Sequence, residues 1–429
     1  MIKFKWETEF KQTEIGEVPG EWEAKSIGQI TKKAIVGSTP LRRIKEYWEK
    51  GTIPWLTNKE VQYDQINFIE DTKEKITPHA LKRTNLELIP PFSLIVSFTA
   101  SVGKVVINKI PITTNQQFIS FILNDNEDVK FYAYYLLLSQ ELIESFSGAT
   151  PFSFITKEKA LQIPIPLPPP SEQSRIATVL SWFDDLIENK KRHNKILEKT
   201  AMAIFKSWFV DFEPFKDEEF VYSEELGKEI PKGWEVQGVS AFADISLGGT
   251  PKREESKYWN GSIKWATAKD VANTKGIYIL ETAEYISEEG LNHSNAKILP
   301  QDSIIITARG TVGEIRLLGE AISFNQTCYG LIPKNNIGTY YLFLSLKHTL
   351  HEIKALSYGT VFDTITMKTF DEMKILVPPP PIIQKFHSLV EPLFQKIILN
   401  QKQIMVLRKV RDALLPMLVF GRLRVVEVY

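Results

Sequence analysis

The sequence contains one unit written twice, and this repeat limits the possible folds more than any other feature. The stretch VGSTPLRRIKEYWEKGTIPWLTNKEV at residues 36–61 aligns with LGGTPKREESKYWNGSIKWATAKDV at residues 247–271, with one residue dropped near Lys50. Further matches at an offset of 210 to 212 residues pair Pro19 and Trp22 with Pro231 and Trp234, Val102-Gly103 with Val312-Gly313, Asn115-Gln116 with Asn325-Gln326, and Pro168 to Pro170 with Pro378 to Pro380. A repeat of this length predicts two copies of one fold.

Each half of the chain has the same internal order. Short β-type runs separated by glycine, proline, asparagine and aspartate fill roughly the first 150 residues of a half, with an apolar helix-like piece at residues 132–143. Proline runs at residues 164–170 and 377–381 end these regions, because proline can continue neither a helix nor a central strand. The pattern predicts an α+β head and a stiff hinge in each half.

A long helix is predicted after each hinge, because apolar residues recur there at alternating spacings of four and three, as in the seam of a coiled coil. The first seam consists of Ile176, Leu180, Phe183, Ile187, Lys190, Asn194, Leu197, Ala201, Ile204 and Trp208, and the second of Phe386, Val390, Leu393, Ile397, Asn400, Ile404, Leu407, Arg411, Leu414 and Leu418. We expect the two helices to pack on each other as an antiparallel coiled coil. The polar seam residues Lys190, Asn194 and Asn400 either fix its register or mark a contact with another subunit.

Together these elements predict an α+β fold with two globular α/β heads in tandem, separated by two long helices that form an antiparallel coiled coil. The predicted boundaries are residues 1–167 for the first head, 168–210 for the first helix, 211–229 for a connector, 230–377 for the second head, and 378–429 for the second helix with a C-terminal tail. The connector has eight acidic and two basic residues, a net charge of −6, which predicts a solvated segment.

Composition excludes several classes of protein. Because 52 Lys and Arg residues balance 52 Asp and Glu residues, a uniformly basic nucleic-acid coat is excluded, whereas a basic face offset by acid elsewhere is not. Cys328 is the single cysteine, which excludes an internal disulfide and a cysteine-based zinc cluster. No apolar run in the sequence approaches the length of a membrane span, which is about 18 residues. The sequence also lacks a secretory signal pattern. We expect a soluble, cytoplasmic protein without a bound metal.

No enzyme motif survives inspection. Residues 102–105, the nearest approach to a phosphate-binding loop, lack its first glycine and its hydroxyl residue. The tetrapeptide at residues 89–92 has Ile89 where an amino-methyltransferase needs an amide or carboxylate to hold the target amino group. His348 and His351 could share a helix face, but they have no matching third metal ligand. The sequence therefore favours recognition over catalysis.

Basic residues with aromatic neighbours occur at equivalent places in both halves. Residues 31–50 contain six Lys or Arg and two Glu residues, a net charge of +4. The corresponding stretch of the second half offers Lys252, Arg253, Lys257 and Lys264. Lysine and arginine neutralise phosphates, whereas Arg, Asn, Gln, Ser and Thr read base edges. The alternative is that these are ordinary solvated faces, with Tyr47-Trp48 and Tyr258-Trp259 as core anchors.

The duplicated order of head, proline run and long helix resembles that of the specificity subunits of type I restriction-modification systems. The motifs that carry the resemblance are PLPPPSEQSRI and VPPPPIIQKF, and it covers nearly all 429 residues. The second copy departs from the pattern, with Ile383-Gln384 where the first has Glu172-Gln173.

The resemblance implies that each head is a target-recognition domain for one half of a bipartite sequence in double-stranded DNA, and that the helices set the gap. It implies two modification subunits, which dock on the helices and methylate adenine with S-adenosylmethionine, and ATP- and Mg-dependent restriction subunits. The chain itself would then be non-catalytic and carry no cofactor.

The positions matched in the repeat, and those near them, supply the predicted DNA contacts. In the first head these are Ser38, Thr39, Arg42, Arg43, Lys59, Ser101, Lys104 and Gln116, and in the second Thr250, Lys252, Arg253, Lys269, Arg309, Thr311 and Gln326. Residues shared by two heads that read different half-sites are better candidates for phosphate positioning or for the fold than for base reading. Base-reading residues are expected where the halves differ.

Two other classes of function stay open at this point. A stand-alone regulator with two DNA-binding heads would use the same basic faces without a methyltransferase partner. A protein–protein scaffold would use the heads and helices without binding nucleic acid. Co-purification with a modification subunit separates the first alternative from a specificity subunit, and a gel-shift assay separates the second.

Overall fold

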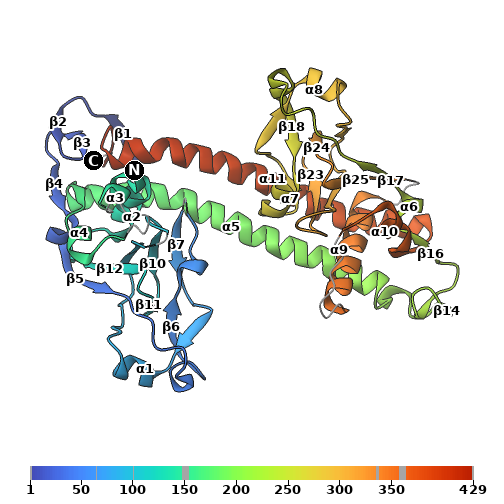
Figure 1. Cartoon of the computed structure of the whole chain (residues 1–429), viewed down its shortest axis with the longest axis horizontal. Coiled ribbons are helices and arrows are strands. Elements are labelled where there is room, and N and C mark those ends of the chain that lie inside the picture. The colour runs from blue at the N-terminus through green and yellow to red at the C-terminus, as the bar shows by residue number, and fades with distance from the viewer. Residues whose placement is uncertain are drawn as a thin grey trace. The chain divides into compact units, whose positions relative to one another are not determined.

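A computed structural model of the chain describes residues 2–63, 65–99, 101–146, 154–334, 338–356 and 364–427 (Figure 1). The chain divides into two compact units. The first unit contains Met1–Asp185 together with Arg408–Tyr429, and the second contains Leu186–Leu407. Each unit therefore takes in one predicted head and parts of both long helices, whereas the boundaries drawn from the sequence set the helices apart from the heads.

The head of the first unit is built on two sheets. The main sheet has the strand order β5 (Thr31–Val36), β12 (Phe118–Leu123), β9 (Leu94–Ser97), β10 (Val105–Asn108) and β7 (Ile66–Ile69). The smaller sheet has the order β11 (Thr113–Thr114), β6 (Ile53–Leu56) and β8 (Glu74–Ile76), followed by the short helix α1 (Pro78–Arg83). In the main sheet β10 runs parallel to β7 and antiparallel to β9.

The main sheet is buried on both faces, which explains why its central strands are mostly apolar. Leu94 and Val96 of β9 pack in a cluster with helix α2 (Val129–Leu138), whereas Ile95 packs in a second cluster on the other face. This alternation follows from the two-residue period of a strand. The predicted apolar helix near residues 132–143 is α2 together with α3 (Gln140–Ser145).

The second unit repeats this design. Its main sheet has the order β17 (Ala243–Leu247), β25 (Cys328–Pro333), β22 (Ile304–Thr307), β23 (Ile315–Leu318) and β19 (Tyr278–Ile279). Its smaller sheet has the order β20 (Glu284–Ile286), β18 (Trp259–Ala266), β24 (Ile322–Phe324) and β21 (Ile298–Leu299). On β22, Ile304 and Ile306 pack on one face and Ile305 on the other, so the predicted duplication of the α+β fold is confirmed.

Further helices, 3₁₀ turns and strand pairs complete both units. The helices are α4 (Lys157–Ala160), α6 (Val239–Phe242), α7 (Ala268–Asn273), α8 (Glu288–Asn292), α9 (Thr339–Leu356) and α10 (Met367–Glu372), with 3₁₀ turns η1 (Ile27–Ile30), η2 (Lys45–Tyr47), η3 (Asn58–Glu60), η4 (Glu213–Phe215) and η5 (Ser256–Tyr258). The paired strands are β2 (Phe10–Thr13) with β3 (Gly16–Pro19), β4 (Glu23–Ser26) with β13 (Pro164–Leu167), β14 (Phe220–Ser223) with β15 (Lys228–Pro231), and β16 (Glu235–Gly238) with β26 (Lys374–Val377).

The two long helices are α5 (Pro170–Phe209) and α11 (Pro380–Val419). In the second unit they run antiparallel, because Lys190 Nζ donates to Gln403 Oε1 (2.6 Å) while Asn194, further along α5, pairs with Asn400, which lies earlier in α11. Asn400 Nδ2 donates to Asn194 Oδ1 at 2.8 Å, and both amides are buried. Of the two interpretations of these polar residues, the pair supports the one in which Asn194 and Asn400 fix the register of the seam.

The acidic connector differs from its prediction as a solvated segment. Its carboxylates are exposed, but Phe212 and Phe215 are buried against Trp234, with ring centroids 5.7 and 4.9 Å from it. Residues 220–223 of the connector also form β14, which pairs with β15. Charge counting missed this because apolar residues spaced between the carboxylates supply the buried side of the segment.

The predicted C-terminal tail is likewise structured. β27 (Leu423–Glu427) pairs antiparallel with β1 (Ile2–Trp6), so the first and last described strands form one sheet of the first unit. Arg424 of β27 binds Glu7, Glu21 and Glu172. In the part of the chain that the structure describes, no helix combines the length and apolarity needed to cross a membrane.

Candidate nucleic-acid interface

Three loops of each head meet at one edge of the main sheet, and we call them the loop cluster. In the first head it comprises residues 37–40, residues 98–103 except Ala100, and residues 115–117; in the second it comprises residues 248–251, 308–313 and 325–327. The first and third loops touch through the Thr39 hydroxyl and the Gln116 side chain, and through Thr250 and Gln326 in the second head. The structure thus joins four of the predicted contact residues into two equivalent pairs.

A close backbone contact fixes the first loop of the cluster in both heads. A Cβ on Gly37 would lie 2.0 Å from the Asn115 carbonyl oxygen, and one on Gly248 would lie 2.3 Å from that of Asn325. Only glycine fits at such distances. The neighbouring N–H of Ser38 donates to the Thr114 carbonyl at 2.9 Å. The matched Gly and Asn residues of the repeat therefore serve the fold of the loop cluster.

Arg42 and Arg253, both predicted DNA contacts, are held within their own heads. Arg253 Nη1 and Nη2 donate to the two carboxylate oxygens of Glu284 at 2.5 and 2.9 Å, and Arg42 pairs with Glu74 in the same bidentate way. The guanidinium carbon of Arg42 lies 3.8 Å from the ring centroid of Trp48, and that of Arg253 lies 3.8 Å from the ring centroid of Trp259. These paired contacts position the loops, because carboxylate and ring faces already occupy the guanidinium.

Each arginine lowers the pKa of the carboxylate with which it pairs. Hydrogen bonding from Arg42 holds the pKa of Glu74 below its ordinary value, and Arg253 does the same for Glu284. The ion pairs are partly exposed, and we expect each to stabilise its head by less than about 1 kcal/mol. Whether these arginines also touch DNA stays a prediction.

A pH titration tests the Arg253 pair. A folded-state pKa below the ordinary carboxyl value means that the pair's stabilisation is present above about pH 4.3 and is lost as the pH falls through the lowered pKa. The variant Glu284→Gln is therefore expected to melt slightly below the wild type at pH 7 and together with it once the pH has fallen below the lowered pKa of Glu284. The exposed Glu254→Gln is the control. A deficit of Glu284→Gln that persists at low pH contradicts the ion-pair account.

Lys104 is also bound inside its own head. Its Nζ donates to the carbonyls of Asn58 and Val61 at 3.0 and 2.7 Å, and burial lowers the pKa of its ammonium. The second head has Glu314 at this place in the repeat. Lys104 therefore closes the loop next to Lys59 in the first head.

The remaining predicted cations are exposed. These residues are Arg43, Lys59, Lys252, Lys269 and Arg309. No hydrogen bond or ion pair links their charged groups to another residue that the structure describes. Ser101 and Thr311 lie in the hairpin loops of the cluster, where their backbone carbonyls accept hydrogen bonds from Ser97 and Thr307. The structure therefore separates the predicted set into residues that build the loops and residues free to meet a ligand.

A groove beside the second loop cluster contains residues that sequence reasoning missed. It has a volume of about 630 Å³ and is lined by Thr250 and Gln326 together with Asn295 and Lys297. At the repeat offset, Lys297 corresponds to Glu87 of the first head, which pairs there with Lys33. The exchange of acid for base between the halves was the signal that could have identified Lys297.

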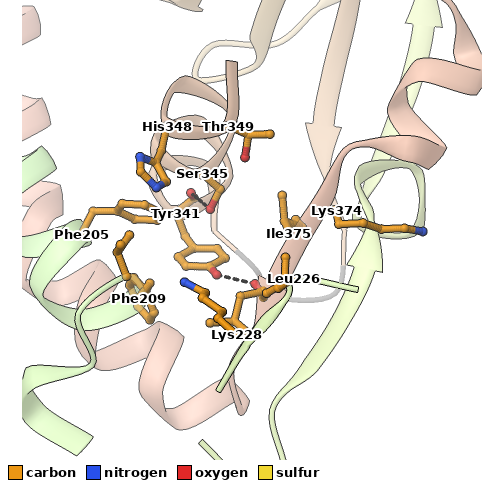
Figure 2. A pocket seen from close by; sticks show the side chains of 12 residues that line it. Phe205, Phe209, Leu226, Lys228, Tyr341, Ser345, His348, Thr349, Lys374 and Ile375 are labelled. Carbon is orange, nitrogen blue, oxygen red and sulfur yellow. Dashed lines mark hydrogen bonds between the residues drawn. The ribbon is translucent and has the colours of Figure 1, made fainter. Parts of the chain in front are cut away.

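A second cavity, of about 280 Å³, lies in the second unit between the end of α5, α9 and β26 (Figure 2). Phe205, Phe209 and Tyr341 form its aromatic wall, and His348 lies beside Phe205 with ring centroids 5.9 Å apart. His351 is exposed, and the described residues hold no group of three or more metal-binding side chains. The cavity contains none of the predicted contact residues.

Comparison with known proteins places this geometry in a family. The family model described as "Type I restriction modification DNA specificity domain" matches residues 19–199 and again residues 231–409. The chain is 42% identical to the type I restriction enzyme MjaIX specificity subunit of Methanocaldococcus jannaschii, over 100% of this chain and 99% of that protein. It is 26% identical to the type I restriction enzyme HindI specificity subunit of Haemophilus influenzae, over 72% of this chain and 77% of that protein.

A solved structure supports the same fold. The crystal structure of the type I restriction-modification system S subunit from M. genitalium superimposes with a TM-score of 0.58, at 19% identity and over 93% of this chain and 96% of that one. The family match covers both copies of the repeat, and the relative from M. jannaschii spans the full length. The chain therefore belongs to the DNA specificity subunits of type I restriction-modification systems.

Proposed function

We propose that each head reads one half of a bipartite site in double-stranded DNA through its loop cluster. The observation that carries the proposal is the repetition of one loop framework with different exposed side chains. The Thr–Gln pairs and the close glycine contacts recur in both heads. In contrast, Lys297 and Arg309 of the second head correspond in the repeat to Glu87 and Thr99 of the first. Equivalent scaffolds with different surfaces suit two half-sites of different sequence.

The exposed cationic side chains of the heads bind the phosphates of the DNA backbone in this proposal. Lys59 on η3 and Lys269 on α7 occupy matched positions in the repeat and are exposed in both heads. A contact needed at every half-site, such as one to phosphate, is expected at matched positions. Binding should therefore weaken as salt rises, in proportion to the number of phosphates contacted.

The two long helices are proposed to set the gap between the half-sites and to dock two modification subunits. The buried Asn194–Asn400 pair fixes their register in the second unit. Both helices also expose apolar side chains, at Leu186, Ile196, Leu389, Leu399 and Val406. Exposed apolar side chains on a coiled coil suit a partner subunit.

In this proposal the chemistry belongs to the partners of a non-catalytic chain. Modification subunits bind S-adenosylmethionine and methylate adenine, restriction subunits use ATP and Mg, and the complex works in the cytoplasm. The relatives support such partners, because their names place them in type I restriction enzymes.

Selection from random DNA tests the proposal. The full chain, tagged and purified from its host with the subunits that accompany it, is incubated with a library of randomised duplexes. We expect enrichment of two short conserved elements separated by a gap of fixed length and free sequence. A single continuous element, or no enrichment although a methyltransferase subunit co-purifies, contradicts the two-headed account.

A further inference from the structure

The hairpin loop of the cluster is anchored in the same way in both heads. The anchors of the first head are the hydrogen bonds Phe98 N–H to Gln117 carbonyl (2.8 Å), Ile155 N–H to Phe98 carbonyl (3.1 Å), Gly103 N–H to Ser97 carbonyl (2.9 Å) and Lys104 N–H to Ser97 Oγ (3.0 Å). Those of the second are Ala308 N–H to Thr327 carbonyl (2.8 Å), Ile365 N–H to Ala308 carbonyl (3.0 Å), Gly313 N–H to Thr307 carbonyl (2.9 Å) and Glu314 N–H to Thr307 Oγ1 (2.9 Å). The residues on either side of the variable position are thus held alike in both heads, and Thr99 of the first head also forms an antiparallel bridge with Phe154.

The side chains on this common backbone differ between the heads. Phe98 and Ala308 both point into the core, with 1% and 2% exposure. The next residue is Thr99 in the first head and Arg309, an exposed residue, in the second. No described residue forms a hydrogen bond or ion pair with that guanidinium, unlike those of Arg42 and Arg253.

We infer that Arg309 reads a guanine in the half-site of the second head. An arginine donates two parallel hydrogen bonds to O6 and N7 of guanine in the major groove, a pattern that no other base offers. The backbone anchors at Ala308 fix where the side chain starts, and Gln326 lies next to the anchoring Thr327. Arg309 therefore extends from the same cluster as the Thr250–Gln326 pair.

The repeat favours base reading over phosphate binding for this residue. Lys59 and Lys269 are matched, as a contact to the uniform backbone requires. Arg309 is matched by a threonine, so its contact belongs to one half-site only. This inference rests on the proposed function, and it names one residue that makes the second half-site differ from the first.

Random-duplex selection with the full chain and its accompanying subunits tests the inference. Arg309→Ala is expected to reduce the preference for guanine at one position of one half-site by at least about tenfold. The other half-site and the gap should stay unchanged. Arg309→Lys keeps the charge without the bidentate fork, so it should retain overall affinity and still lose most of the guanine preference.

Lys269→Ala is the matched control. It should weaken binding to all sequences alike and make the salt dependence shallower. If Arg309→Ala behaves in this way, Arg309 is a phosphate contact and the inference is overturned. An unchanged guanine preference in Arg309→Ala also overturns the inference. The proposed function still stands in that case if the wild type selects a bipartite motif. A wild-type complex without sequence preference overturns the proposed function, and the inference with it.

Discussion

Replacing Arg424 by methionine is expected to destabilise the first unit by about 3–5 kcal/mol. Arg424 Nε and Nη2 donate to the Glu172 carboxylate at 2.5 and 2.6 Å, and the same guanidinium binds Glu7 and Glu21. Glu172 is 1% exposed, so the variant leaves its carboxylate buried, with the Trp22 indole N–H, at 3.1 Å, as its remaining donor among the described residues. Hydrogen exchange followed by mass spectrometry measures the loss separately in each unit.

The chain offers matched controls for Arg424. Arg422, two residues earlier, is exposed, and Arg422→Met should change stability by less than about 0.5 kcal/mol. The double variant Arg424→Met with Glu172→Gln should recover part of the loss, because it removes the unpaired charge. Equal exchange rates in Arg424→Met and the wild type would show that the ion pairs of Arg424 with Glu7, Glu21 and Glu172 do not hold β27 against the head.

The second large effect is expected from Trp265→Ala, at about 3–5 kcal/mol in the second head. Trp265 is 1% exposed, and its Nε1 donates to the Gly249 carbonyl at 3.0 Å, at the base of the loop cluster. Trp259 meets it edge-on with centroids 5.1 Å apart. Removing the indole therefore takes away a core side chain and an anchor of the loop together. Random-duplex selection should then show the second half-site lost and the first retained.

Trp55→Ala provides the mirror experiment. Trp55 is 2% exposed and donates to the Ser38 carbonyl at 3.0 Å. This variant should remove recognition of the other half-site and leave the half-site of the second head intact. Loss of both half-sites in each single variant would contradict independent reading by the two heads.

The architecture followed from local patterns in the sequence. The repeat predicted two heads of one fold, and the heptad spacing predicted the two long helices, because both signals are patterns along the sequence itself. The sequence marked Asn194 and Asn400 as polar seam residues, but only the structure shows that they pair. The connector was only partly predicted. Its charge pattern gave exposed carboxylates correctly, but the burial of Phe212 and Phe215 depends on Trp234, a residue of the following head.

The candidate site was less predictable, because its contacts join distant residues. Arg42 and Glu74 are 32 positions apart, and Arg253 and Glu284 are 31 apart, so no local pattern shows that they meet. The sequence marked the arginines as basic surface, whereas the fold gives each a carboxylate and a tryptophan face. The residues that differ between the heads, Arg309 among them, become informative only once the matched hydrogen bonds show that their backbones are equivalent.

The central claim is that this chain confers a two-part DNA specificity on a modification complex. Single-molecule methylation mapping of the host genome, with and without the gene for this chain, tests it most directly. We predict that one methylated motif disappears with the gene, and that it consists of two specific elements separated by a fixed gap of free sequence. A methylation pattern that is unchanged without the chain, or a lost motif that is continuous, would contradict the account.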